Sequence, residues 1–96
     1  MLDTQGRLGI GEELLSRIKI KSETTVQCFL DTTKKALVLI PETVDVDGEN
    51  LYFIQTIKIH KGARIIMPDK IKKAFPEAHY LPSAFEGRIY IHIFEK

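Results

Sequence analysis

Basic side chains gather in the second half of this 96-residue chain. Between Ile57 and Phe75 one acidic residue, Asp69, faces six basic ones, so the segment carries a local net charge of +5; the six are Lys58, Lys61, Arg64, Lys70, Lys72 and Lys73. An Arg guanidinium can bind a phosphate or a guanine edge through two hydrogen bonds, whereas a Lys ammonium is a mobile charge suited to phosphate. The segment therefore predicts contact with nucleic acid. A solvated, lysine-rich surface is the alternative, since the net charge of the whole chain is only +1.

No pattern of catalytic residues accompanies these charges. The chain has no Gly-rich phosphate loop, no Gly-x-Ser-x-Gly elbow and no metal-binding run. His60, His79 and His92 lack the spacing of metal ligands. Glu12 and Glu13 are adjacent on an expected helix and therefore point apart. We expect a protein that is not an enzyme and that uses no cofactor and no metal ion.

Length and composition predict a single domain over residues 1–96, because 44% hydrophobic and 28% charged residues are ordinary values for a globular chain. The one cysteine, Cys28, allows no internal disulfide, which suits a reducing cytosol. The N-terminal residues lack a signal region, and the longest apolar run, Ala36 to Ile40, is far shorter than the ~18 residues of a membrane helix. We expect a cytoplasmic protein without a membrane span.

The elements that would position the basic residues occur twice. Residues 8–18 match residues 65–75 when the chain is shifted by 57 positions, which also places Arg7 on Arg64. In each copy a small residue precedes the Arg and a short strand of alternating polarity follows it. A glycine in the first copy and a proline in the second then open a two-turn helix.

Strand-like sequence follows each helix. In the first copy residues 24–30 and 36–40 flank a polar turn, and in the second copy residues 88–94 follow a turn at Glu86 and Gly87, so each copy predicts a hairpin. Pro82 confines any strand around it to a sheet edge or a turn.

The repeats organise the whole chain. Repeat one covers residues 1–41, an acidic linker covers 42–50, and repeat two covers 51–96. Neither repeat can bury its own apolar face at this size, so the two must pack together. We expect a mainly β fold with two short helices, closed into a small β-barrel with internal pseudo-two-fold symmetry. The aromatic residues of the strands are expected in the barrel core or in an interface rather than as base-stacking platforms; they are Tyr52, Phe53, Phe85, Tyr90 and Phe94.

The two Arg-containing segments resemble the AbrB/SpoVT/MazE-type family of DNA-binding proteins. Residues 6–14, and more closely residues 63–75, match its signature of Gly-Arg, alternating apolar residues, proline, and a basic pair on the helix, and Asp3 occupies the acidic position before the first Gly-Arg. The tandem arrangement is similar to that of MraZ-type proteins, in which two repeats complete one barrel. The resemblance implies a swapped-hairpin, cradle-loop β-barrel and a prokaryotic transcription regulator of AbrB-like type that binds double-stranded DNA.

The resemblance also implies which residues touch DNA. The turn arginines, the basic pair of the second helix and, more loosely, the lysines before the second turn are Arg7, Arg64, Lys72, Lys73, Lys58 and Lys61. The first copy departs from the pattern, because Leu15 and Ser16 replace the basic pair and the helix begins with two acidic residues. We therefore expect the second repeat to supply most of the affinity. Arg7 and Arg64 have a structural alternative, an ion pair with Asp3 or with a glutamate across the barrel.

Other partners and functions stay open beside this hypothesis. MazE-like antitoxins bind toxins through an extended C-terminal tail, and this chain stops at Lys96 directly after its last expected strand, so a toxin partner is not expected. A homo-oligomer is left open. The alternative functions are a protein-interaction or oligomerisation barrel that has lost DNA binding, and a barrel that binds a small ligand. An exposed Leu15 next to other apolar groups would favour the interaction barrel.

Overall fold

The computed structural model describes residues 6–21, 23–46 and 48–95. These residues form a mainly β fold with two short helices, as the sequence predicted. The elements in chain order are β1 (Arg7–Gly9), α1 (Glu12–Arg17), β2 (Thr25–Asp31), β3 (Ala36–Pro41), β4 (Tyr52–Lys58), β5 (Arg64–Ile66), α2 (Asp69–Ala74), β6 (His79–Phe85) and β7 (Arg88–Phe94).

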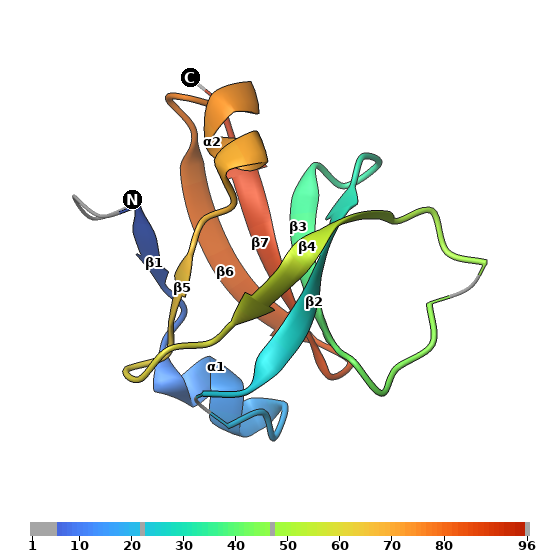
Figure 1. The fold of residues 1–96 in the computed structure, drawn as a ribbon, viewed down its shortest axis with the longest axis vertical. Helices are drawn as coiled ribbons and strands as arrows, with labels where there is room; N and C mark the ends of the chain where they lie inside the picture. The colour runs from blue at the N-terminus through green and yellow to red at the C-terminus, as the bar shows by residue number, and fades with distance from the viewer. Residues whose placement is uncertain (1–5, 22, 47, 96) are drawn as a thin grey trace.

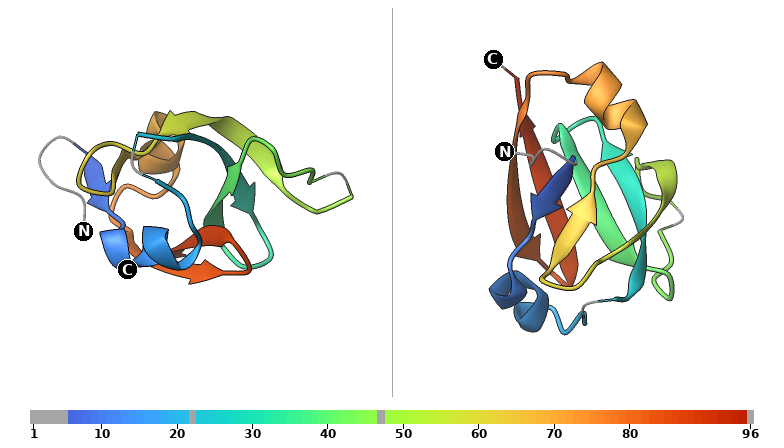
Figure 2. Two further views of the ribbon diagram at one scale, coloured as in Figure 1. Left: turned by 90° about the horizontal axis from the view of Figure 1, so that it is seen from below. Right: turned by 60° about the vertical axis from the view of Figure 1, so that its left-hand side comes forward.

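The strands form two antiparallel sheets. Five of them lie in the order β4-β2-β3-β7-β6, and β1 pairs with β5 in a separate two-stranded ribbon (Figure 1). The ribbon lies across one face of the larger sheet, with α1 at one of its ends and α2 at the other (Figure 2). Leu8 and Ile65 of the ribbon are buried in the same core as Leu37, Leu39 and Ile91 of the sheet. Burial of these side chains between the two sheets stabilises the fold and fixes the position of the ribbon.

Local sequence explains the two hairpins. After β2, the Asp31 carboxylate accepts hydrogen bonds from the backbone N–H groups of Thr33 and Lys34 at 3.0 and 3.1 Å, which shapes the turn into β3. Between β6 and β7, Glu86 and Gly87 have φ values of 50° and 77°. Two residues with positive φ suit a two-residue hairpin turn. β6, which contains Pro82, is an edge strand, as its proline predicted.

The ribbon relates the two repeats by a local two-fold. Its register pairs the middle residue of β1 with the middle residue of β5, and these two residues are the ones that the 57-position offset matches. The N–H of Ile10 donates to the carbonyl of Ala63 at 2.7 Å, and the matching bond, from the N–H of Met67 to the carbonyl of Gly6, is 3.0 Å. Both helices begin and end at residues separated by the same offset. The sequence repeat is therefore also a structural repeat.

Elements of one repeat pack on elements of the other. β4 of the second repeat pairs with β2 of the first, and β3 pairs with β7. α1 packs against β6, and the Lys35 ammonium of the first hairpin turn lies 5.5 Å from the ring centroid of Phe75 after α2. The second repeat therefore completes the core of the first, which explains why neither of these short segments needs a core of its own.

The expected closed barrel is wrong for the described residues. β4 and β6 form the two edges of the five-stranded sheet and are not paired with each other, and the β1-β5 ribbon is a separate sheet. By the 57-position offset, the counterpart of β4 falls at residue 1 and before it, outside the described residues. Pro82 adds a second reason, because a proline in β6 has no N–H to donate to a further strand.

The linker covers part of the outer face of the larger sheet, the face turned away from the ribbon. Val46 of the linker and Leu51, the first residue of the second repeat, pack on a small apolar cluster formed there by Phe29, Val38 and Ile40.

An ion pair also attaches the linker to β7. The Arg88 guanidinium donates to both carboxylate oxygens of Glu49 at 2.6 and 2.7 Å. This bidentate pair lowers the pKa of Glu49 and raises that of Arg88, mainly through the shared hydrogen bonds.

Candidate nucleic-acid interface

The structure places Arg7 and Arg64 on the same solvent-facing side of the ribbon. Side chains alternate along each strand, so Leu8 and Ile65 point into the core and the flanking residues point outward. The register pairs Arg7 with Ile66 and Gly9 with Arg64. The two arginines are therefore diagonal neighbours, at roughly 7–8 Å between such positions on a sheet. One arginine comes from each repeat.

The Arg64 side chain turns back over the tight turn that precedes β5. A Cβ placed on Gly62 would lie 3.3 Å from Nε and from Nη2 of Arg64, so the absence of a side chain at Gly62 makes room for the guanidinium. Gly62 also has a φ of +85°, which favours glycine. The N–H of His60 donates to the Arg64 carbonyl at 2.7 Å and closes the turn. This geometry brings the exposed Lys61 close to Arg64 in the same turn.

Lys72 approaches the opposite end of the ribbon from α2. Its Nζ lies 3.0 Å from the position that a Cβ on Gly6 would take, and 3.1 Å from Oδ1 of Asp69. Gly6 has a φ of +75°, a conformation that favours glycine. The absence of a side chain at Gly6 also leaves room for the Lys72 ammonium. Lys73, the next residue of α2, is exposed.

The six residues expected to touch DNA thus form two groups joined by the ribbon. Arg7, Lys72 and Lys73 lie at the α2 end; Lys58, Lys61 and Arg64 lie at the α1 end. Among the described residues, none of Lys58, Lys61, Arg64 and Lys73 is in a salt bridge. The expected face consisted mainly of Arg64, Lys72 and Lys73 of the second repeat, with Arg7 as an additional contact. The structure instead separates Arg64 from Lys72 and Lys73 and puts Arg7 of the first repeat beside the two lysines.

The first helix differs from the second in charge and in packing. Leu15 occupies the position of Lys72 and is only 3% exposed, so it lies in the core instead of pointing outward. The exposed Leu15 that would have favoured an interaction barrel is therefore not observed. Glu13 pairs with Arg17 at 3.0 Å, and Glu12 is exposed. The α1 end of the ribbon carries carboxylates beside its basic groups. Asp3, the alternative partner considered for Arg7, lies outside the described residues.

A second surface was missed by sequence reasoning. Several of the strand aromatics expected in a core or an interface are exposed, and Phe85, Tyr90, His92 and Phe94 form a row on the outer face of the β6-β7 hairpin. Oγ of Ser83 lies 3.2 Å from Nε2 of His92, beside the row. The alternation of residues 88–94 did predict that these side chains share one face. It did not predict that the face is uncovered.

In the part of the chain that the structure describes, no three His, Cys, Asp or Glu side chains gather as they would around a metal ion. Cys28 is buried, and desolvation raises the pKa of its thiol to about 12, so it is a poor nucleophile.

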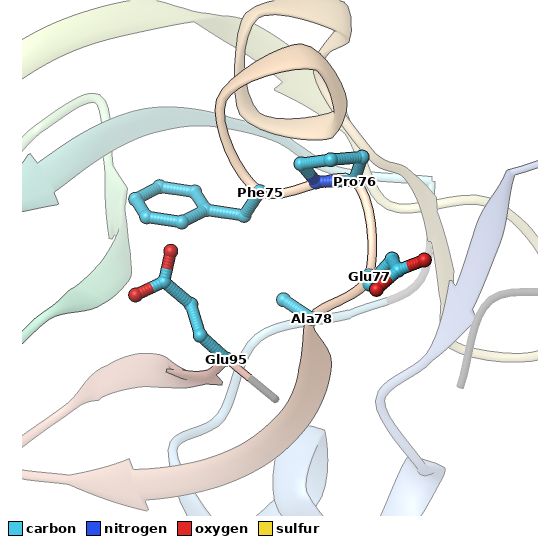
Figure 3. Close-up of a pocket in the computed structure, with 5 residues that line it drawn as sticks. All are labelled: Phe75, Pro76, Glu77, Ala78 and Glu95. Atoms are coloured by element: carbon cyan, nitrogen blue, oxygen red, sulfur yellow. The ribbon is translucent and has the colours of Figure 1, made fainter.

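A pocket of about 280 Å³ lies between the end of α2 and the end of β7 (Figure 3). Phe75, Pro76, Ala78 and two carboxylates, Glu77 and Glu95, line it, and Glu95 is paired with Lys35. These acidic groups would repel a phosphate ligand.

A scan against protein-family models found no matching family, and searches of curated proteins and of solved structures found no similar protein. No helix among the described residues has both the length and the apolar character needed to cross a membrane.

Proposed function

We propose that the chain binds double-stranded DNA as a transcription regulator of AbrB-like type, with the β1-β5 ribbon as the element that approaches the duplex. The observation that carries the proposal is the placement of Arg7 and Arg64 on one outer face of the ribbon. Each Arg follows a turn residue with positive φ, Gly6 in one repeat and Ala63 in the other. Two guanidinium groups related by a local two-fold match the two-fold symmetry of duplex DNA.

The dimensions of the ribbon support this geometry. The major groove of B-DNA admits a two-stranded β-ribbon, and an arginine there can donate two hydrogen bonds to a guanine edge. The lysines at the two ends of the ribbon would contact phosphates and hold its register on the duplex. Ile66, which is 48% exposed beside Arg7, would supply an apolar contact of the kind that thymine methyl groups accept.

The proposal extends to the architecture. The exchange of contacts between repeats, with β4 on β2 and α1 on β6, is what a swapped-hairpin fold of two repeats would have. In this proposal the fold is a swapped-hairpin arrangement whose sheet stays open at β6 and does not close into a barrel.

Salt-dependent fluorescence anisotropy with mixed-sequence duplex DNA tests the proposal. On mixed-sequence DNA the arginines also contact phosphates, so five or six phosphate contacts predict a slope of log affinity against log salt of about −4.5 to −5.4 between about 50 and 200 mM. The triple variant Arg64→Ala/Lys72→Ala/Lys73→Ala should reduce the slope by about two to three units.

A matched pair of single variants controls for net charge. Arg64→Ala should lower the slope by about one unit, whereas Lys34→Ala removes the same charge on the opposite face of the sheet and should leave it unchanged. A folded wild-type protein that does not bind duplex DNA at low salt would refute the function. Equal effects of the two single variants would refute the placement of the interface on the ribbon.

A further inference from the structure

A small pocket lies on the outer face of the β6-β7 hairpin, on the side of the sheet turned away from the ribbon. It has a volume of about 200 Å³ and is lined by Lys34, Ser83, Phe85, Tyr90 and His92. We call it the hairpin pocket. Pockets for drug-sized ligands measure roughly 300–1,000 Å³, so the hairpin pocket has room for a smaller ligand with a single ring.

The local sequence of β6 explains why the surface is hollow here. Leu81, Ser83 and Phe85 share the outward face of this strand, and the serine is the small residue between two large ones. Ser83 pairs with Tyr90 across the hairpin. The short serine side chain therefore leaves space beside the Tyr90 ring, and Phe85, which is 58% exposed, forms a wall of this space.

Three rings give the hairpin pocket an aromatic lining. The rings of Tyr90 and His92 are nearly parallel, with an angle of 20° between their planes and their centroids 6.5 Å apart. The Phe85 ring meets the Tyr90 ring at 61°, also with 6.5 Å between the centroids. Aromatic pairs prefer offset-stacked or edge-to-face arrangements, and these two orientations offer a ligand ring both kinds of contact. The lining therefore favours a ligand that is itself aromatic.

The hairpin pocket also contains a positive charge. The Lys34 ammonium lies 4.9 Å from the centroid of the tyrosine ring. Within the described residues no salt bridge involves Lys34, whereas the neighbouring Lys35 is paired with Glu95. The pocket near α2 is lined by two carboxylates, but none of the described residues that line the hairpin pocket is acidic. A ligand with one negative charge thus complements this site, whereas a nucleic acid would need several cations.

The Ser83 hydroxyl supplies a second donor for an acid group. Its Oγ lies 3.2 Å from Nε2 of His92. When Nε2 carries the proton of the imidazole ring, it donates to Oγ, and the hydroxyl proton is free to donate to a ligand. An ammonium and a hydroxyl beside an aromatic lining are suitable donors for a carboxylate, because hydrogen bonds to a charged acceptor are stronger than those between neutral groups.

We propose that the hairpin pocket binds a small aromatic carboxylate, with the ring of the ligand packed against Tyr90 and Phe85 and its carboxylate held by Lys34 and Ser83. The ribbon lies on the other side of the sheet, so the ligand and the ribbon do not compete for the same surface. The proposal does not depend on DNA binding.

Amide chemical shifts of the whole chain, followed by NMR while benzoate is added, test the proposal. Benzoate should cause saturable shifts at the residues of the hairpin pocket, with a dissociation constant of about 1 mM. Acetate has the charge without the ring, and benzyl alcohol has the ring without the charge, so each should bind about tenfold more weakly. No saturable shifts up to about 10 mM benzoate, shifts confined to the ribbon, or equal binding of acetate and benzoate would each overturn the proposal.

Two variants test the parts played by charge and shape. Lys34→Gln should weaken the binding of benzoate about tenfold, whereas the matched control Lys21→Gln removes the same charge at an exposed position beyond α1 and should have no effect. Equal effects of these two variants would refute the role of Lys34.

Ser83→Leu should fill the space between its two large neighbours and abolish the binding of benzoate, with an unchanged melting temperature because the position faces outward on an edge strand. Ser83→Ala keeps the space and loses only the hydroxyl, so it should weaken binding about threefold. A folded Ser83→Leu variant that binds benzoate as tightly as the wild-type protein would overturn the assignment of the pocket.

Discussion

Replacement of Ser16 by lysine should convert the first helix into a second DNA-binding arm. Ser16 is the counterpart of Lys73 at the 57-position offset, and both residues are exposed near the end of a six-residue helix. The Ser16 hydroxyl donates only to the carbonyls of Glu12 and Glu13 on the solvent side of its own helix, so its loss costs little. A lysine in the last turn also interacts favourably with the helix dipole.

The magnitude follows from counterion release. One added phosphate contact steepens the slope of log affinity against log salt by about 0.9. Extrapolated to 100 mM salt, one such contact tightens binding about eightfold. Anisotropy titrations of Ser16→Lys and wild type against the same duplex would measure both quantities.

The control is Thr43→Lys, which adds the same charge at an exposed linker position away from the ribbon. If Ser16→Lys binds no more tightly than this control, the two-fold relation between the repeats does not extend to DNA binding. If Thr43→Lys increases the affinity for DNA as much as Ser16→Lys does, the increase comes from net charge, and this result would also refute a second DNA-binding arm.

Three further predictions concern stability and reactivity. Ile65→Ala should lower the free energy of unfolding in urea by about 2–5 kcal/mol because Ile65 is fully buried. Ile66→Ala, on the outer face of the ribbon, should change this free energy by at most about 1 kcal/mol. Similar losses for the two variants would contradict the assignment of Ile65 to the core and Ile66 to the outer face. The lowered pKa of Glu49 adds stability that is present above the ordinary carboxyl pKa and is lost as the pH falls through the lowered value. Wild type should therefore exceed Glu49→Gln by up to about 1 kcal/mol at neutral pH, and this difference should shrink steadily as the solution is acidified; a difference that does not depend on pH would exclude the charged pair with Arg88 as its source. Cys28, with its pKa raised to about 12, should resist a thiol reagent at about pH 8 until the protein unfolds; rapid labelling of the native protein would contradict its burial.

Local sequence was sufficient to predict most of the elements. The alternation of polar and apolar residues placed most of the strands, and a glycine or proline opened each helix, as the structure has it. Pro82 correctly indicated an edge strand. These features depend on backbone conformations that a few neighbouring residues decide, so the sequence carries them directly.

Features that depend on distant residues were predicted less well. The sequence left open whether Leu15, the counterpart of the basic Lys72, faces solvent, and the structure buries it beside the other repeat. Phe85 and Phe94 were expected in a core or an interface, and the linker that could have covered them packs on the first hairpin instead. Alternation shows which side chains share a face, but only the packing of remote segments decides which face is covered.

The sequence by itself determined the repeat, the two helices, most of the strands and the six candidate basic residues. Only the tertiary structure decided that β1 pairs with β5, that Arg7 therefore joins Arg64 on one surface, and that the sheet stays open at β6. The physical reason is that strand pairing joins residues far apart in the chain, here residue 7 to residue 66. The pairing is stabilised by the core that Leu8 and Ile65 share with the strands beneath them. This core exists only in the folded chain, so no local segment of the sequence determines it.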